Sequence, residues 1–222
     1  MTFPKYVLAA AMLTLAASAY ADPTLINEGF DDITTLAGAG WSFQNDSVPA
    51  TPGESWFQGD NTLAFTAQSG AANSYIASSF LAAEPGGFID NLLVTPFFSL
   101  ESDVLLTFWA RSQIVPGFTD TFAVLAGTTA GSALEVVSEV LGATVAAGDW
   151  TQYSVLLTGQ GAGSVGRFGF EYFGPSDSSN YLGIDTVTVT AVPEPGTYLL
   201  MGLGLAALGA LRSRKAARES TL

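Results

Sequence analysis

Cysteine and histidine are both absent from the 222 residues of the chain. Without them it can form no Ser-His-Asp or Cys-His nucleophile system, no thiolate zinc site and no disulfide. Basic residues are few: seven Lys and Arg stand against 20 Asp and Glu, for a formal net charge of -13. Because phosphate binding needs clustered cations, a nucleic acid is not expected as a partner. The remaining chemistry is that of carboxylates, which can bind hard cations such as calcium or act as a pair on a glycosidic bond.

The chain begins in the way that a secretory signal peptide does. A short n-region, residues 1–5, precedes a Leu/Ala run over residues 6–17, and Ala19-Tyr20-Ala21 follows the small-x-small rule for cleavage. We therefore predict a signal peptide over residues 1–21. A retained membrane anchor is the alternative, although the apolar run is shorter than the ~20 residues that a bilayer span needs.

The C-terminal segment, residues 192–218, has three parts: a proline box, an apolar stretch and a basic cluster. The apolar stretch, 197–211, would reach about 24 Å as a helix, a little short of a ~30 Å hydrocarbon core, and we predict a single transmembrane helix there. The basic residues of 212–218 would hold the C-terminus on the cytoplasmic side and the domain outside. The box before the helix consists of Val192, Pro193, Glu194, Pro195 and Gly196.

These three parts, in this order and at the extreme C-terminus, resemble the PEP-CTERM sorting signal of Gram-negative bacteria. The resemblance implies recognition by an exosortase, a membrane-embedded transpeptidase-like protease. It further implies removal of the tail and delivery to the cell surface or extracellular matrix in an organism that makes exopolysaccharide. An ordinary tail anchor with a proline-rich stalk is the alternative.

Between the two ends, residues 22–191 contain 18 acids, no lysine and two bases, Arg111 and Arg167. Their net charge of -16 is more negative than the -13 of the whole chain, because most bases lie in the two terminal segments. Such a surface keeps an exported protein soluble, and it repels anionic polysaccharide unless divalent cations bridge the two.

Hydrophobic residues in this middle region alternate with a period of two, and turn residues recur every eight to twelve positions. Phe168, Phe170 and Tyr172 show the alternation, as do the residues around Leu106 and Val155. The pattern predicts an all-β domain over 22–191, an antiparallel jelly-roll β-sandwich. The other predicted strands are 24–30, 62–67, 75–80, 120–127, 134–140 and 181–190.

A second resemblance spans roughly residues 25–190. Its markers, in order, are Asn27-Glu28-Gly29-Phe30-Asp31 with Gly40-Trp41, then Asp90 to Pro96, Leu105 to Arg111, Trp150 to Val155, and Tyr181 to Val187. They look like the choice-of-anchor J or cleaved-adhesin domain, which is related to MAM-type jelly rolls. The family implies a sandwich used in adhesion, or in glycan and protein binding, at cell surfaces.

One candidate site is a structural calcium ion. Leu182 and Ile184 share one phase of the last strand while Val187 shares the other, and such a slip predicts a β-bulge at Asp185. In jelly rolls of the resembled kind the first and last strands lie side by side, which would bring Asp185 near Glu28 and Asp31. Carboxylates with backbone carbonyls suit calcium. The alternative is that these are solvated turn acids, with Asp185 capping a bulge.

A second candidate site is a sugar platform. Trp109 and Arg111 share one strand face, where an aromatic ring could stack on a pyranose and the guanidinium could bind its hydroxyls. An arginine paired with an acid across strands is the alternative. Trp41, Trp56 and Trp150 flank predicted loops and are expected to cover the core, or to offer one ligand platform.

The expected function is therefore non-enzymatic, since 18 scattered acids indicate no catalytic pair. We predict an exported adhesion or structural protein whose partners are an exosortase, exopolysaccharide or surface glycans and proteins, and, before processing, the membrane. A carbohydrate-binding lectin is one alternative, and a polysaccharide hydrolase is another.

Overall fold

The computed structural model describes residues 24–128, 135–136, 148–192 and 202–204. The predicted signal peptide, residues Pro193 to Gly196 of the proline box and the basic cluster lie outside the described residues. Of the predicted membrane helix, residues 202–204 are described and are helical. Among the described residues, none forms a helix with the length and apolar character of a membrane span.

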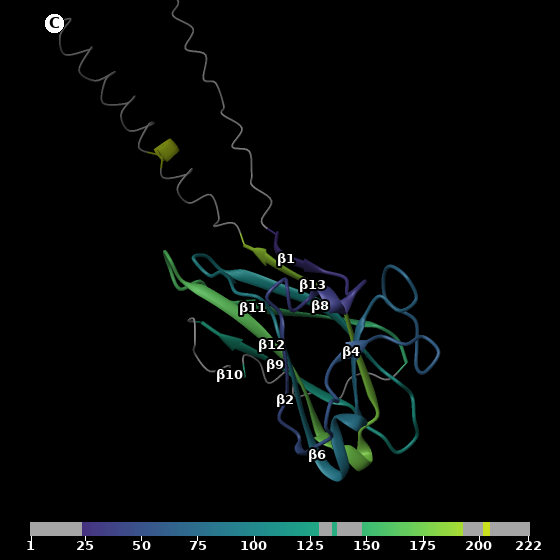
Figure 1. Cartoon of the computed structure of the whole chain (residues 1–222). Coiled ribbons are helices and arrows are strands. Elements are labelled where there is room, and N and C mark those ends of the chain that lie inside the picture. Colours follow the sequence, from purple (N-terminus) through teal and green to yellow (C-terminus); the bar gives the residue numbers. More distant parts are fainter. Residues whose placement is uncertain (1–23, 129–134, 137–147, 193–201, 205–222) are drawn as a thin grey trace, which may run out of the picture.

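Two antiparallel sheets form a sandwich, which confirms the predicted fold class (Figure 1). The first sheet has the order β11-β8-β13-β5-β4, with β1 also paired to β13. Its strands are β1 (Thr24–Glu28), β4 (Phe57–Gln58), β5 (Ile76–Ser79), β8 (Val104–Ser112), β11 (Thr151–Leu157) and β13 (Tyr181–Ala191).

The second sheet has the order β10-β9-β12-β6-β2, with β3 paired to β6 and β7 to β12. Its strands are β2 (Ser42–Asn45), β3 (Val48–Ala50), β6 (Ala83–Val94), β7 (Phe98–Ser99), β9 (Thr121–Gly127), β10 (Glu135–Val136) and β12 (Val165–Pro175). Three short 3-10 turns complete the described part: η1 (Ile33–Thr35), η2 (Phe80–Ala82) and η4 (Ser176–Ser178). Successive long strands β8, β9, β11, β12 and β13 alternate between the sheets, as in a jelly roll.

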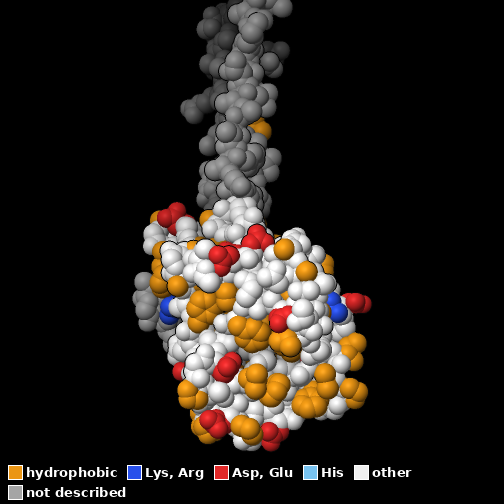
Figure 2. All heavy atoms as spheres, turned by 45° about the vertical axis from the view of Figure 1, so that its right-hand side comes forward, with side chains coloured by type: hydrophobic (Ala, Val, Ile, Leu, Met, Phe, Trp, Pro, Cys, Tyr) orange, Lys and Arg blue, Asp and Glu red, His pale blue; other side chains and the backbone are white. Residues whose placement is uncertain are grey.

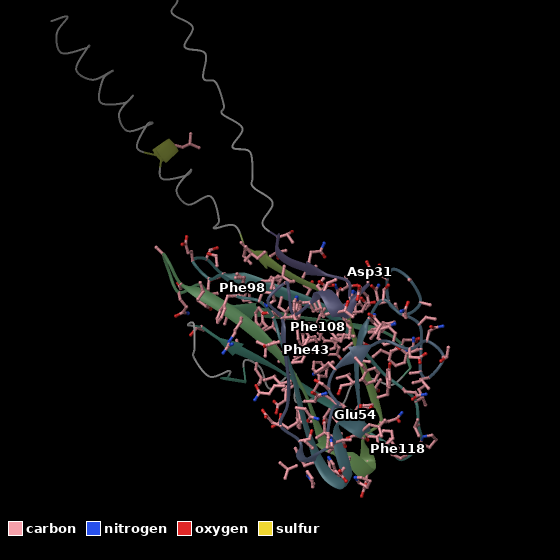
Figure 3. The ribbon with its side chains drawn as sticks, in the orientation of Figure 1. Asp31, Phe43, Glu54, Phe98, Phe108 and Phe118 are labelled. Atoms are coloured by element: carbon pink, nitrogen blue, oxygen red, sulfur yellow. The ribbon has the colours of Figure 1, made fainter. Side chains whose placement is uncertain are left out.

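The core lies between the sheets and is built from the alternating residues of the sequence. Val104, Leu106 and Phe108 of β8 are fully buried, while the residues between them are only half-buried. Phe168 and Phe170 of β12 meet them from the other sheet. Figure 3 shows Phe108, Phe98 and Phe43 in the space between the two layers. A two-residue period therefore correctly indicated which faces are buried.

One predicted strand, 62–67, is wrong. Asp60 Oδ1 accepts hydrogen bonds from the N–H and the hydroxyl of Thr62, at 2.7 and 2.6 Å, and this side-chain contact makes a turn. The chain then folds back over the outer face of the first sheet, where Phe65 stacks on Tyr75 with ring centroids 5.3 Å apart. Of the predicted strand 134–140, only β10 lies among the described residues.

The first and last strands lie side by side, as predicted: Glu28 pairs with Val187 and Ile26 with Val189. The start of β1 and the end of β13 therefore lie at the same end of the sandwich, at the top of Figure 1. The turn into β6, together with η2 and η4, lies at the opposite end, which we call the distal end.

Candidate functional site

Asp185 occupies the predicted β-bulge, because the register of β13 against β8 shifts between Asp185 and Thr188. Its side chain is fully buried. Oδ2 accepts hydrogen bonds from the backbone N–H of Gln68 at 2.8 Å and of Ser69 at 3.1 Å, and Oδ1 accepts from the N–H of Thr186 at 2.6 Å. Burial has the larger effect on the pKa of Asp185 and raises it, while these hydrogen bonds act to lower it.

The other two acids of the calcium prediction lie on the segment that follows β1. Glu28 Oε1 accepts a hydrogen bond from the N–H of Phe30 at 2.7 Å. Asp31 is exposed, and its Oδ1 lies beside Gly70, where a Cβ would be 3.2 Å from it. Asp185 therefore binds the loop over residues 66–70, and Asp31 lies beside the same loop.

Backbone strain accompanies both acids. Phe30, directly before Asp31, has φ 54°, and Thr186, directly after Asp185, has φ 51°. In the part of the chain that the structure describes, they are the non-glycine residues with positive φ. A β-branched residue in this conformation costs of order 1–3 kcal/mol and is maintained only by its surroundings. The strain therefore marks the region around Asp31 and Asp185 in the first sheet as a candidate site.

A metal would need more ligands than these side chains supply. Residues 24–128, 135–136, 148–192 and 202–204 contain no group of three His, Cys, Asp or Glu side chains that could hold an ion. Any calcium bound here would have to draw on backbone carbonyl oxygens beside Asp31 and Asp185. Calcium at Glu28, Asp31 and Asp185 thus stays a prediction. What the contacts do show is that Asp185 fastens the loop 66–70 to β13.

The predicted sugar platform lies under the same loop. The Arg111 guanidinium carbon is 4.4 Å from the ring centroid of Phe65, a cation-π contact that covers one face of the group. Trp109, on the same strand face, is half-buried. Trp150 meets Phe65 edge-on, and its Nε1 donates to the carbonyl of Thr66 at 2.9 Å. Arg111 is thus engaged within the domain, and a ligand role for it stays a prediction.

Two other tryptophans are part of the core, as expected. Trp41 and Trp56 are buried, and Trp41 meets Phe30 edge-on with ring centroids 5.6 Å apart. Arg167, the other cation of the domain, lies over the ring of Phe97 at 5.1 Å.

A polar hollow of about 350 Å³ lies on the outer face of the second sheet. Asp90 and Glu171 share a hydrogen bond there, beside Asp46, Gln44 and Arg167. Burial raises the pKa of Asp90 and of Glu171, and a neighbouring carboxylate raises each further, Asp46 for Asp90 and Asp90 for Glu171. The hollow therefore presents several donors and acceptors of hydrogen bonds to the solvent.

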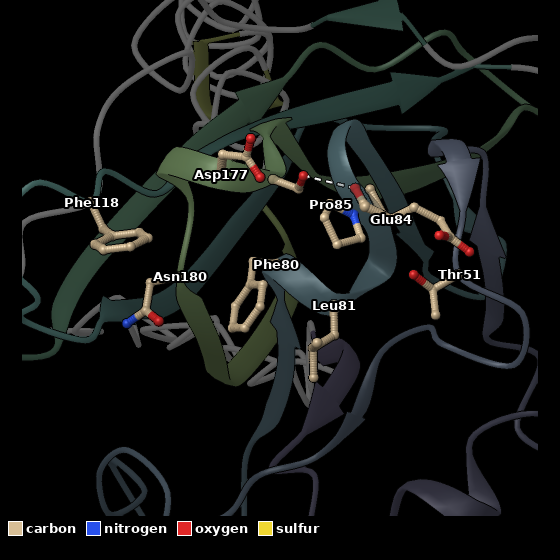
Figure 4. Close-up of a pocket in the computed structure, with 10 residues that line it drawn as sticks. Thr51, Phe80, Leu81, Glu84, Pro85, Phe118, Asp177 and Asn180 are labelled. Atoms are coloured by element: carbon tan, nitrogen blue, oxygen red, sulfur yellow. Dashed lines mark hydrogen bonds between the residues drawn. The ribbon is translucent and has the colours of Figure 1, made fainter.

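The distal end contains two adjoining apolar hollows, of about 400 and 420 Å³. Phe80, Leu81 and Asn180 line both, so that η2 forms a ridge between them, which we call the Phe80–Leu81 ridge. In Figure 4, Phe118 and Asn180 lie on one side of Phe80, and Pro85 and Glu84 on the other. The first hollow is completed by Thr51, Ala83, Ser176 and Asp177, and the second by Glu54, Phe57, Leu63, Ser79, Gln113 and Tyr181.

No sequence pattern predicted the two hollows, because the residues that line them come from segments that are far apart in the chain and meet only after folding. The available local signal was the pair Phe80-Leu81, two large apolar residues that directly follow β5. Both are exposed. Figure 2 shows hydrophobic side chains gathered over the distal end, with acidic side chains around them.

Comparisons with known proteins agree with this architecture. The family model described as Cleaved Adhesin Domain matches residues 24–168, and that of the PEP-CTERM protein-sorting motif matches residues 191–215. The K1 cleaved adhesin domain of Lys-gingipain from Porphyromonas gingivalis W83 is a similar solved structure, with a TM-score of 0.55 and 20% identity over 77% of this chain and 99% of that one. The K3 domain of the same protein has a TM-score of 0.51 and 20% identity, over 76% and 99%. No curated protein matched the chain.

Proposed function

The chain belongs to the Cleaved Adhesin Domain family and carries a PEP-CTERM protein-sorting motif, and on that basis we propose a non-enzymatic adhesion or structural role associated with exopolysaccharide or biofilm. The domain and the motif together indicate an exported, cell-surface protein. The two K domains support the fold, whereas the role in adhesion comes from the family and is our proposal.

The observation that carries the proposal is the position of the motif relative to the fold. The motif match starts at residue 191, where β13 ends, and β13 pairs with β1 at the end opposite to η2 and η4. A tether beyond β13 would therefore present the distal end to the surroundings. The -16 charge of residues 22–191 supports contact with an anionic matrix through divalent cations.

Sorting by an exosortase in a Gram-negative host, with transient anchoring by the C-terminal helix, belongs to this proposal. Replacing Pro193, Glu194 and Pro195 by alanine should leave an uncleaved form in the membrane fraction, because the extended box is the segment that the protease would read. The measurement is an immunoblot of membrane, surface and medium fractions. Normal release of the triple variant would contradict the proposed sorting.

The adhesion role is tested by a cell-surface comparison. A strain that lacks the protein should retain less exopolysaccharide on its cells than the parent, and the wild-type chain should restore it. Equal retention in both strains, with the protein shown to be on the parental surface, would refute the role without touching the sorting proposal.

A carbohydrate-binding lectin is the second candidate, and the polar hollow on the second sheet favours it. Gln44, Asp46 and Glu171 converge there with Arg167, a set of donors and acceptors that suits sugar hydroxyls. The full chain on a glycan array should then bind defined glycans, and Gln44→Ala should weaken this binding. Absence of binding to every glycan would remove the lectin, and release of reducing ends would indicate a hydrolase instead.

A further inference from the structure

The Phe80–Leu81 ridge is unusual in how much apolar surface it leaves in water. Leu81 is 50% exposed and Phe80 41%, and on either side Leu63 and Phe118 are 66% and 44% exposed. Scattered exposed apolar residues are normal, but a contiguous patch that lines two hollows marks an interaction site.

The ridge is held in place by hydrogen bonds before any partner arrives. Ser79 Oγ caps η2 by accepting from the N–H of Leu81 at 3.3 Å, and the N–H of Phe80 donates to the carbonyl of Asn180 at 2.9 Å. On the far side of the first hollow, Asp177 Oδ1 accepts from the N–H of Gly86 at 2.9 Å. A partner therefore meets a preformed surface and loses little entropy in ordering it.

The rim of the two hollows is acidic. Glu84 and Asp177 border the first hollow and Glu54 the second, and the residues that line them include no lysine or arginine. The two arginines of the domain are engaged elsewhere, over Phe65 and Phe97. An apolar ridge with an acidic rim complements a partner with apolar residues and flanking positive charge.

We infer that the Phe80–Leu81 ridge docks a protein partner through a segment that has large apolar side chains flanked by lysine or arginine. The apolar side chains fill the two hollows and the basic ones meet Glu54, Glu84 and Asp177. This inference rests on the proposed surface location and names the class of partner that the presented end contacts.

Other occupants fit the surface less well. A sugar stacks on flat aromatic faces and needs hydrogen-bond partners for its hydroxyls, whereas Leu81 and Leu63 offer neither. A second copy of the chain would bring the same acidic rim against this one, with like charges facing each other.

The test selects random dodecapeptides by display on the immobilised full chain in detergent. The selected peptides should combine aliphatic or aromatic residues with flanking Lys or Arg. Leu81→Asp should weaken their binding by about tenfold or more, because it removes the central apolar contact of the interface. Leu156→Asp is the matched control: Leu156 is 58% exposed on β11, the opposite edge of the same sheet from β4, and its substitution should change nothing.

A second variant tests the charge. Glu84→Gln leaves the apolar surface intact, and it should weaken binding several-fold at low salt and progressively less as the ionic strength rises. Circular dichroism spectra that match the wild type exclude misfolding of either variant.

Four outcomes would overturn the inference. Peptides without a basic bias, or binding that is unaffected by both Leu81→Asp and Glu84→Gln, would remove the docking site. If the protein binds a neutral dextran, if Leu81→Asp loses this binding, and if no selected peptide depends on Leu81, the ridge would be assigned to a glycan. Sedimentation of a dimer that Leu81→Asp dissociates would assign it to a second copy. None of these results would alter the location of the protein, which the fractionation experiment measures separately.

Discussion

Replacing Asp185 by alanine removes the buried acceptor that holds the loop 66–70 against β13. The backbone N–H groups of Gln68, Ser69 and Thr186 lose their partner. A hydrogen bond to a charged group contributes roughly 1.5–3 kcal/mol, so three such bonds amount to several kcal/mol before any offset.

Two effects make the loss of stability smaller than the sum of the three hydrogen bonds. Water can replace the lost partner at Ser69, which is exposed, and the burial that raises the pKa of Asp185 means that the wild-type carboxylate already loses hydration. We therefore expect the free energy of unfolding to fall by about 3 kcal/mol. In a domain of this size each kcal/mol lowers Tm by roughly 2–4 °C, which gives a fall of roughly 6–12 °C.

Two measurements check this. Thermal unfolding followed by circular dichroism gives the fall in Tm, and Glu101→Ala is the control, because Glu101 is an exposed acid with one backbone hydrogen bond, from Gly163. Amide hydrogen exchange gives the local effect: the N–H groups of Gln68 and Ser69 should exchange about tenfold faster or more. Unchanged exchange at these two amides would refute the role assigned to Asp185, whatever the change in Tm.

The same carboxyl gives a pH dependence. Because burial raises the pKa of Asp185, the folded state holds this proton more tightly than the unfolded state does. The stability of the wild type relative to Asp185→Asn should therefore be greatest below the ordinary aspartate pKa of 3.8 and fall as the pH rises through the raised pKa. Urea unfolding of both proteins across this range measures the difference, and a difference that grows with pH would contradict the reasoning.

Three further predictions follow from other contacts. Gly59→Ala should lower the free energy of unfolding by about 1–3 kcal/mol, because a Cβ there overlaps the buried ring of Tyr75, whereas Gly29→Ala, with no atom within 4 Å of its Cβ, should stay within about 0.5 kcal/mol in urea titrations. Glu171→Gln should raise Tm at pH 7 and have no such effect at pH 3, because the raised pKa of Glu171 makes its ionised form unfavourable beside Asp90; a lower Tm at pH 7 would refute this. If calcium binds at the bulge as predicted, millimolar calcium should raise the Tm of chelator-treated protein, and equal Tm values would leave that site with its amide hydrogen bonds alone.

Local patterns sufficed for the strands and for the bulge. Val104 and Phe168 belong to runs in which every second residue is apolar, and burial on one face of a sheet imposes that period. The slip of phase beside Asp185 was readable for the same reason, since the apolar residues on both sides of it must face the core. The turn after Asp60 was not readable, because a side-chain contact with Thr62 overrides the strand propensity of the segment.

The candidate sites depended on contacts between distant segments, which the sequence does not show. Pairing of β1 with β13 could be expected from the family resemblance, but the loop that brings Gln68 to Asp185 could not, because the two residues are far apart in the chain. Phe65 over Arg111 depends on the same loop. The hollows beside the Phe80–Leu81 ridge form only when connections from distant parts of the chain, among them those that contain Leu63, Phe118 and Asn180, meet at the distal end.

The position of β13 also determines how the domain would carry force. Asn180, which accepts a hydrogen bond from Phe80 on the ridge, directly precedes β13, and Ala191, where the sorting motif begins, ends it. A pull between a docked partner and a tether would therefore run along this one strand, which lies inside its sheet between β8 on one side and β1 and β5 on the other. The hydrogen bonds of antiparallel strands lie across the strand direction, so such a load shears them together instead of opening them one by one. We expect the domain to hold best when it is stretched along the axis from its tether to its ridge.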